Sequence, residues 1–332
     1  MPPRVTIALP TYNRAALLRG AIESVLAQTC ADFEIFISDN ASTDNTAEVV
    51  ASYQDPRIRY HRHAVNLGIT RNWQFAVNAA RTAFVAPLAD DDLYLPEHLA
   101  AALAALEQYP SVAYYACPAE YFGQDLGSTH LRPDAITDKT TPLLYWPPER
   151  SVMFLGSDNP GPMTCMVCRR EALQDLFWGP PGFLPQDLLI MTQLMAQGGF
   201  VFGNRALYRY RVHAANTSVL TEKNARLKFN CMVWYAVRWL AQFLLRRQLC
   251  TLADIEAHGL HSPSLERHVV PLVLGLSSFD SPSALRAVAR RVFAARCDAD
   301  LISARFRLAR RLGFNILPIA EKLTQLQVGW RP

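Results

Sequence analysis

Three consecutive carboxylates follow a short apolar run in the stretch Phe84-Val85-Ala86-Pro87-Leu88-Ala89-Asp90-Asp91-Asp92-Leu93-Tyr94-Leu95-Pro96. The apolar run predicts a buried strand, and Pro96 begins a helical pattern over residues 97–108. Carboxylates this close repel one another, so their ionised state needs a stabilising partner. A divalent cation with oxygen ligands provides one and keeps coordination positions for the phosphates of a substrate. The alternative is a solvated acidic turn that caps the next helix.

Strand and helix patterns alternate through the first hundred residues. We predict strands at residues 5–9, 34–38, 58–61 and 84–88, with helices at 17–26, around 49–50 and at 70–80. This repetition predicts an α/β fold with a mostly parallel central sheet and helices on both faces. Ligands of such sheets bind beyond the carboxyl ends of the strands, where the polar motifs of this half also fall.

The first of these motifs excludes a simple dinucleotide-binding domain. The loop after the first strand reads Pro10-Thr11-Tyr12-Asn13-Arg14 and lacks the glycines that let a backbone approach pyrophosphate. Phosphates must therefore be neutralised by another group, and the acidic stretch with a metal ion is the obvious candidate.

Four motifs, in this order, resemble those of the family 2 inverting glycosyltransferases of GT-A fold. They are Leu9-Pro10-Thr11-Tyr12-Asn13-Arg14, Ser38-Asp39-Asn40-Ala41-Ser42-Thr43-Asp44, Asn66-Leu67-Gly68-Ile69-Thr70-Arg71-Asn72 and Asp90-Asp91-Asp92-Leu93-Tyr94-Leu95-Pro96. The resemblance covers roughly residues 4–220. It implies a GT-A type, Rossmann-like sheet and the transfer of a sugar from a nucleotide-sugar donor.

The resemblance also implies roles for single residues. Those implied in nucleotide-sugar binding are Pro10, Thr11, Tyr12, Arg14, Asp39, Asn66, Arg71 and Asp90. Among them, Asp39 would accept from an N–H of the base and Asp90 would face the ribose. Asp91, with Asp92 and His213, would hold Mg²⁺ or Mn²⁺ at the diphosphate. The chain departs from the family at Ala89, where an additional Asp is common. Without the resemblance, Asp39 is equally readable as a turn or cap residue.

A separate acid is expected on the acceptor side, because a carboxylate must take the proton of the attacking hydroxyl. Asp187 resembles the family's general base, although Gln186 stands where the family usually has Glu. An Asp at a helix start is also an ordinary N-terminal charge. The other nearby acid, Asp175, is placed in a helix-like segment. His213 lies in a motif that resembles the end of the family's catalytic domain; a histidine without a catalytic role is the alternative.

The chain divides at about residue 225. We predict a catalytic domain at residues 1–225 and a basic, mostly helical extension at residues 226–332. The extension carries 16 Lys and Arg against 7 Asp and Glu, although the net charge of the whole chain is only +4. We expect it to pack on the catalytic domain with a solvated basic face. An interfacial helix on an anionic membrane is the alternative.

No export signal or membrane-spanning segment is recognised in the sequence, so we expect a cytoplasmic protein, with the inner face of the cell membrane as a second location. The seven cysteines are scattered, which suits reduced thiols. Cys165 and Cys168 lie in a strand-like run over residues 163–168. Core packing is therefore favoured for them over a metal or redox site.

Together these features predict a metal-dependent inverting glycosyltransferase that uses a UDP-sugar and a glycan or lipid-linked sugar acceptor. A catalytically inactive nucleotide-sugar-binding subunit is one alternative, favoured by Ala89 and Gln186. A sugar nucleotidyltransferase is another, but it predicts a glycine-rich loop after the first strand, which is missing. Nucleic-acid binding is disfavoured, because no recognition motif accompanies the basic tail.

Overall fold

The computed structural model describes residues 2–123, 141–155, 161–179, 182, 184–213, 233, 236–237, 239–241, 243–251 and 253–254. The first part alternates strand and helix as predicted. Its elements are β1 (Val5–Thr11), α1 (Ala15–Leu26), β2 (Phe33–Asp39), α2 (Thr46–Ala51), β3 (Ile58–Arg62), α3 (Ile69–Asn78), β4 (Phe84–Pro87), β5 (Leu93–Tyr94) and α4 (His98–Gln108).

The second part is less regular. Its strands are β6 (Tyr114–Ala116), β7 (Ala119–Gly123), β8 (Leu143–Trp146), β9 (Val167–Arg169), β10 (Phe200–Gly203) and β11 (Tyr208–Val212). Its helices are α5 (Gln186–Gly198) and the 3₁₀ segments η1 (Pro148–Leu155), η2 (Met163–Cys165) and η3 (Arg170–Leu173). Gly199, the residue that follows α5, has φ +72. A Cβ at this position would overlap the carbonyl oxygen of Trp146.

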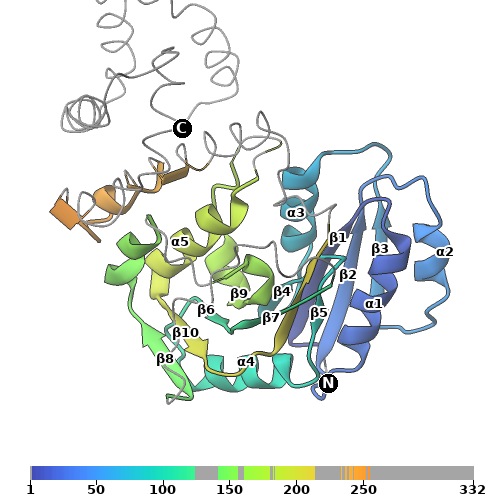
Figure 1. Ribbon diagram of the computed structural model, residues 1–332, viewed down its shortest axis with the longest axis horizontal. Helices are drawn as coiled ribbons and strands as arrows, with labels where there is room; N and C mark the ends of the chain where they lie inside the picture. The colour runs from blue at the N-terminus through green and yellow to red at the C-terminus, as the bar shows by residue number, and fades with distance from the viewer. Residues whose placement is uncertain are drawn as a thin grey trace, which may run out of the picture.

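Eight strands form the central sheet, in the order β3-β2-β1-β4-β9-β6-β10-β8. The strands β3, β2, β1 and β4 pair in parallel, while β9 runs antiparallel to both β4 and β6 and β8 runs antiparallel to β10. Figure 1 shows this sheet crossing the molecule with helices around it. The predicted α/β class with a mostly parallel sheet is confirmed.

A smaller sheet has the order β5-β11-β7. Strand β11 pairs antiparallel with β5 and in parallel with β7. Because β5 directly follows the three carboxylates, this pairing brings residues 208–213 to the acidic stretch from more than a hundred positions away in the sequence.

Strand β1 is buried along its whole length between β2 and β4, as expected of a central parallel strand. Proline fits near its end for a specific reason. The backbone carbonyl of Ala8 points toward β4, since it accepts from Leu88 N–H. Pro10 lies two residues further along the strand, so its backbone nitrogen points to the same side. The β1–β4 pairing ends at Ala8 and Pro87, so Pro10 costs no ladder hydrogen bond. The two chains diverge there, and the site lies beyond that point.

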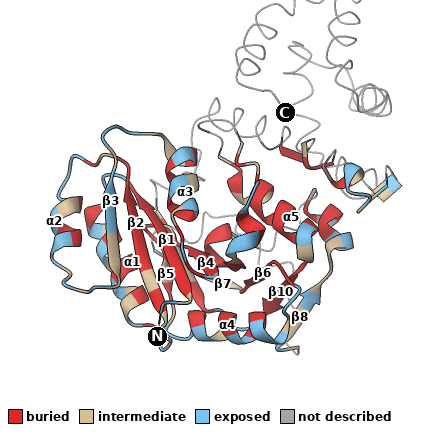
Figure 2. Ribbon diagram, turned by 180° about the vertical axis from the view of Figure 1, so that it is seen from behind, coloured by how far each residue is buried: buried red, intermediate tan, exposed pale blue. Residues whose placement is uncertain are grey.

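The main core lies around the central sheet, whose strands are largely buried in Figure 2. Helix α3 packs against β1 and β2, and α4 against β6 and β9. A second apolar cluster joins Val152 and Leu189 to Ala236, Leu240 and Leu244. The start of the predicted C-terminal extension therefore packs against α5. Most of residues 226–332, including the later arginines, lie outside the described residues.

Two local predictions were wrong. Residues 163–165 form the 3₁₀ segment η2 rather than a strand, and strand β9 begins only at Val167. Asp175 does not lie in a helix: η3 ends at Leu173, and Asp175 is an exposed turn residue with φ +59. The core-packing interpretation of Cys165 and Cys168 is confirmed, because both are buried free thiols.

Candidate active site

The carboxyl ends of β1 and β4 bring a cluster of polar side chains together. The Thr11 hydroxyl donates to Asp90 Oδ2 at 2.7 Å. The Arg14 guanidinium contacts both acids, at 3.1 Å from Asp90 Oδ1 and 2.8 Å from Asp91 Oδ2. This one cation therefore offsets part of the repulsion within the acidic stretch, a role that the sequence analysis reserved for a metal ion.

Burial shapes the charges of this cluster. It raises the pKa of Asp90 to about 6, against the opposing effect of Arg14. Burial also acts to lower the pKa of Arg14, but the carboxylates of Asp90 and Asp91 outweigh it and raise that pKa above its ordinary value. Arg14 therefore remains a fixed positive charge at the edge of the site.

His213 follows β11 and lies at the same cluster, with Nε2 3.1 Å from Asp91 Oδ2. The end of β11 is attached to the acidic stretch by its backbone and by a side chain. Arg211 N–H donates to Asp92 Oδ1 at 2.8 Å, and Arg211 Nε donates to the carbonyl of Asp91 at 2.8 Å. The structure thus brings His213 and Asp91 together, as the motif suggested.

Asp92 is held by partners inside the protein. It is 1% exposed, and its Oδ2 accepts from the hydroxyl of Tyr208, which in turn lies 2.5 Å from the Thr164 hydroxyl. Burial and the neighbouring Asp91 raise the pKa of Asp92 well above its ordinary value. Both oxygens of Asp92 are therefore engaged by protein donors.

Asp39 forms a second acidic position at the end of β2, opposite Thr11 in the β1–β2 register. It is fully buried. Its Oδ1 accepts from Ser42 N–H at 2.9 Å and its Oδ2 from the Tyr60 hydroxyl at 2.6 Å. Arg62 Nε lies 3.7 Å from Oδ2. Asp39 thus closes the turn after β2 through Ser42, while β3 supplies Tyr60 and Arg62 as its other partners.

The remaining predicted donor residues lie at the same edge with looser connections. Asn66 Oδ1 accepts from Asn40 Nδ2 at 2.9 Å, which attaches the loop before α3 to the loop after β2. Pro10 is buried, whereas Tyr12 is 43% exposed. Arg71 is exposed in the first turn of α3.

Asp187 lies in the first turn of α5, on a segment separate from the acidic stretch. Burial raises its pKa to about 6, against a hydrogen bond from the backbone N–H of Met163, which favours the ionised form. Segment η2 packs against α5, and its Thr164 lies beside the hydroxyl of Tyr208.

Sequence reasoning missed four partners of the predicted residues: Tyr60, Thr164, Tyr208 and Arg211. Tyr208 and Arg211 stand within the same motif as His213, which runs over residues 208–218, so that motif held a usable signal. Tyr60 and Thr164 had none, because single hydroxyl residues in short strand-like runs are ordinary.

The fit of a divalent ion can be judged from the donor set. In the described part of the chain, no three His, Cys, Asp or Glu side chains stand together as a ready-made metal site. Asp91 nevertheless offers a carboxylate oxygen, a ligand that suits Mg²⁺ or Mn²⁺ when water and phosphate oxygens supply the other ligands. His213 places an imidazole nitrogen beside it. The predicted metal role of Asp92 stays a prediction.

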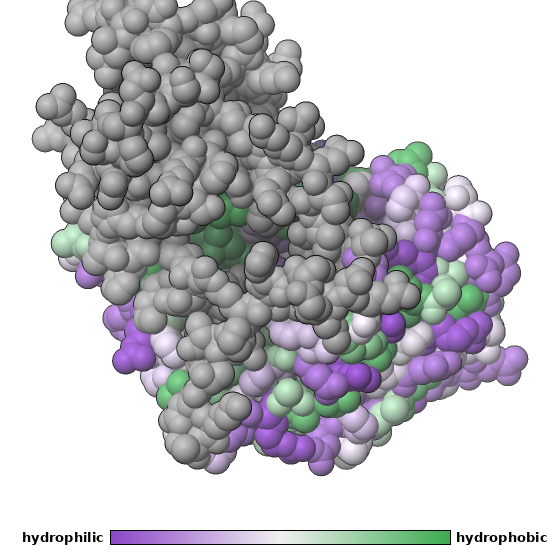
Figure 3. Space-filling view, in the orientation of Figure 1, coloured by the Kyte–Doolittle hydropathy of each residue, from purple (hydrophilic) through white to green (hydrophobic). Residues whose placement is uncertain are grey.

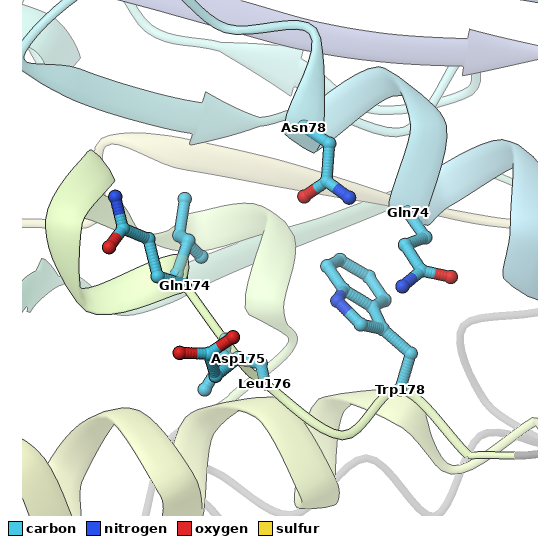
Figure 4. A pocket seen from close by; sticks show the side chains of 7 residues that line it. Gln74, Asn78, Gln174, Asp175, Leu176 and Trp178 are labelled. Carbon is cyan, nitrogen blue, oxygen red and sulfur yellow. The ribbon is translucent and has the colours of Figure 1, made fainter.

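A cavity of about 320 Å³ lies away from these acids, between α3 and the segment after η3. Figure 4 shows Gln74 and Asn78 of α3 directed toward the indole of Trp178, with Gln174 and Asp175 on the other side. Its lining also includes Leu173 and Leu176. None of the predicted site residues lines it.

Two surface observations complete the description. Hydrophilic residues predominate on the visible side that carries α1 and α2 (Figure 3). Within the described ranges, no helix has the length and apolar character needed to span a membrane.

Relatives of known sequence match part of the chain. The putative colanic acid biosynthesis glycosyl transferase WcaA of Escherichia coli (strain K12) is 32% identical over 129 residues, which cover 37% of this chain and 46% of the relative. The GalNAc(5)-diNAcBac-PP-undecaprenol beta-1,3-glucosyltransferase of Campylobacter jejuni is 36% identical over 115 residues, which cover 34% of this chain and 36% of the relative. The chain thus spans less than half of the length of these two relatives.

Solved structures match over a longer stretch. S. aureus TarS 1-349 in complex with UDP-GlcNAc has a TM-score of 0.58 at 14% identity, over 87% of this chain and 90% of that chain. Mannosyltransferase PcManGT from Pyrobaculum calidifontis, in complex with GDP-Man and Mn²⁺, has a TM-score of 0.53 at 16% identity, over 98% and 85%. At this identity the likeness shows the fold alone, and it confirms the predicted GT-A type architecture.

The family model described as Glycosyl transferase family 2 matches residues 6–177, more than half of the 332 residues. That range contains β1, β2, β4 and the acidic stretch, whose side chains meet at one edge of the sheet. The chain therefore belongs to glycosyl transferase family 2.

Proposed function

We propose that this chain transfers a sugar from a nucleotide-diphosphate donor to a hydroxyl of a glycan or lipid-linked sugar, with inversion at the anomeric carbon. A UDP-sugar is the proposed donor, supported by the UDP-GlcNAc complex of TarS 1-349. The GDP-Man complex of PcManGT makes a GDP-sugar the alternative to test. The undecaprenol-linked substrate in the name of the Campylobacter relative supports a lipid-linked acceptor.

The observation that carries this proposal is the contrast between Asp91 and Asp187. Asp91 lies between two basic side chains, Arg14 and His213. This arrangement suits a position beside a negatively charged diphosphate. Asp187 lies on a different segment, and burial raises its pKa to about 6. A general base works best with a pKa near the operating pH, so Asp187 is the proposed acceptor-side base.

Each residue of the site has a proposed role in the transfer. Asp187 takes the proton of the acceptor hydroxyl as that oxygen attacks the anomeric carbon. Arg14 offers a positive charge to the departing diphosphate. Asp91 and His213 would hold Mg²⁺ or Mn²⁺, and a bound ion would stabilise the negative charge of the leaving group as a Lewis acid. Thr11, Asp39 and Asp90 would orient the nucleoside.

The test begins with a thermal-shift screen of UDP, GDP and their sugars, with and without Mn²⁺. A ligand that binds only the folded state raises the melting temperature according to its concentration over its Kd. Turnover is then followed as release of nucleoside diphosphate. Binding without release would favour the inactive subunit, and formation of UDP-sugar from UTP and a sugar phosphate would favour a nucleotidyltransferase.

The pH dependence of Asp187 gives two signed expectations. As base, it works only when ionised, so kcat should fall about tenfold for each pH unit below about 6. Stability should change in the opposite sense. The folded pKa is raised above the ordinary 3.8, so the folded state binds the proton more tightly, and this contribution to stability is lost as pH rises through 6.

Asp187→Asn should therefore raise the free energy of unfolding at pH 7.5 by about 1–3 kcal/mol relative to the wild type. At pH 4 the two proteins should be nearly equal. Urea unfolding at the two pH values measures this difference. An equal effect of the substitution at both values would contradict the raised pKa.

Asp39→Asn should weaken UDP binding about tenfold, ~1.4 kcal/mol, because the amide keeps the shape of the side chain but replaces one acceptor oxygen with a donor. The preference for uracil over guanine nucleotides should fall with it. Calorimetric titration with UDP and GDP measures both. Asp55→Asn is the matched control, since it removes a carboxylate paired with Arg57 in a turn away from these strand ends. Unchanged UDP affinity of Asp39→Asn would reject the role.

The domain boundary near residue 225 and contact with an anionic membrane remain predictions. Ala236, Val237, Leu240, Ala241 and Leu244 contribute to the cluster on α5, which supports a packed rather than an independent extension. Arg246 and Arg247 are exposed, and the other arginines that suggested the membrane contact lie outside the described residues.

A further inference from the structure

We propose that Thr164 is a positioning residue: through Tyr208 and Asp92, its hydroxyl holds the Asp91–His213 pair in place relative to Asp187. The inference rests on the proposed function, because it assigns Asp91 and His213 to the diphosphate side and Asp187 to the acceptor side. It adds a physical connection between the two sides that neither the motifs nor the relatives describe.

The connection begins with three buried side chains in sequence. Thr164 is 6% exposed, Tyr208 is fully buried and Asp92 is 1% exposed. The two hydroxyl oxygens of Thr164 and Tyr208 lie 2.5 Å apart, and the Tyr208 hydroxyl donates to Asp92 Oδ2. The tyrosine has one proton. Because the Tyr208 hydroxyl uses that proton in its hydrogen bond to the Asp92 carboxylate, the Thr164 hydroxyl must donate to the Tyr208 oxygen.

Asp92 passes this restraint to the diphosphate side. Its second oxygen accepts from Arg211 N–H at 2.8 Å, and Arg211 Nε donates to the carbonyl of Asp91. His213 follows two residues later, with Nε2 3.1 Å from Asp91 Oδ2. Among the described residues, the ladder that joins β11 to the acidic segment is the short pairing of Tyr208 and Arg209 with β5. The side chain of Asp92 therefore helps, together with the pairings of β11 with β5 and β7, to fix where His213 lies.

The other end of the connection is on the acceptor side. Segment η2, which contains Met163 and Thr164, packs against α5, the helix that carries Asp187 in its first turn. Segment η2 is only three residues long, and one rigid turn cannot shift at Met163 without shifting at Thr164. A hydrogen bond lost at Thr164 should therefore change the distance between the base and the diphosphate site, and small misplacements of reacting groups are costly in rate.

The experiment compares Thr164→Val, which keeps the shape and removes the hydroxyl, with Thr164→Ser, which keeps the hydroxyl. Calorimetric titration of the 332-residue chain with UDP, with and without Mn²⁺, gives the gain in affinity that the ion provides. We expect Thr164→Val to reduce that gain about tenfold, equivalent to ~1.4 kcal/mol. Thr164→Ser should restore it to within about threefold of the wild type.

A melting-temperature measurement without ligand separates positioning from stability. If Thr164→Val lowers the melting temperature but keeps the full Mn²⁺-dependent gain, Thr164 is structural only and the proposal is overturned. Equal losses in Thr164→Val and Thr164→Ser would overturn it too, because the hydroxyl would then be irrelevant. Wild-type protein whose UDP and GDP affinities do not respond to Mn²⁺ would overturn the metal-dependent function first, and this inference with it.

Discussion

Asp187→Asn is expected to lower kcat by roughly 10²–10⁴-fold, the usual contribution of a positioned base. The amide has nearly the shape of the carboxylate but cannot take the proton of the acceptor hydroxyl. Donor binding should stay near the wild-type value, because Asp187 lies on α5 and the acids of the donor site lie at the ends of β2 and β4. Steady-state kinetics with saturating donor and acceptor measure kcat, and titration with UDP measures donor binding.

Asp175→Asn is the matched control for this experiment. It removes the neighbouring acid of the same half, which is exposed in the turn after η3, and should leave kcat within about twofold of the wild type. If Asp187→Asn instead loses UDP binding and keeps its turnover at saturation, Asp187 belongs to the donor pocket and another group is the base.

The second large effect is expected at Asp91. Asp91→Asn should lower UDP affinity in Mn²⁺ by at least about 100-fold, since even partners that only orient a metal ligand are worth 10–100-fold. Affinity without metal should change much less. Arg14 keeps its contact with Asp90 in this variant, so the cluster retains an internal ion pair. Calorimetry with and without Mn²⁺ separates the two contributions.

Folding must be intact for that result to count. Asp91 lies at a strand end and is 7% exposed, so its loss should leave the circular dichroism spectrum and the cooperative melt unchanged. Asp55→Asn, which removes the acid paired with Arg57, serves as the surface control. An Asp91→Asn protein that keeps its full Mn²⁺-dependent affinity would show that the ion, if bound, is held elsewhere.

Local sequence patterns were sufficient to predict the first part of the fold, from β1 to α4. The period-two and 3.6-residue patterns predicted β1, β2, β4 and the helices between them, and parallel pairing then places Thr11, Asp39 and Asp90 at one edge. These strands are consecutive in a repeating unit, so their neighbours in space follow from their order in the chain. The motif at Asp187 was also found, although only through the family resemblance.

The second part of the fold, from β6 to β11, was less predictable for a physical reason. Strand β9 enters the sheet between β4 and β6 in the antiparallel direction, and β11 joins β5 and β7. Pairings of this kind depend on contacts across large sequence separations, which no local periodicity encodes. Short apolar runs are ambiguous for the same reason, so residues 163–165 were predicted as strand and form a 3₁₀ turn. Tyr60 and Thr164 became visible only as partners of Asp39 and Tyr208.

The attachment of β11 to β5 has a consequence for how the protein is made. Tyr208, Arg211 and His213 reach Asp91 and Asp92 across 116 to 122 positions of sequence. Contacts of such high separation form late, because the entropy of closing a long loop must first be overcome. A growing chain that has emerged only to residue 177, the last that the family model matches, has the acidic stretch but none of these partners. Its Asp92 would be a carboxylate with no donor to accept from. We therefore expect nucleotide to bind, and to protect the chain from proteolysis, only after β11 has emerged from the ribosome.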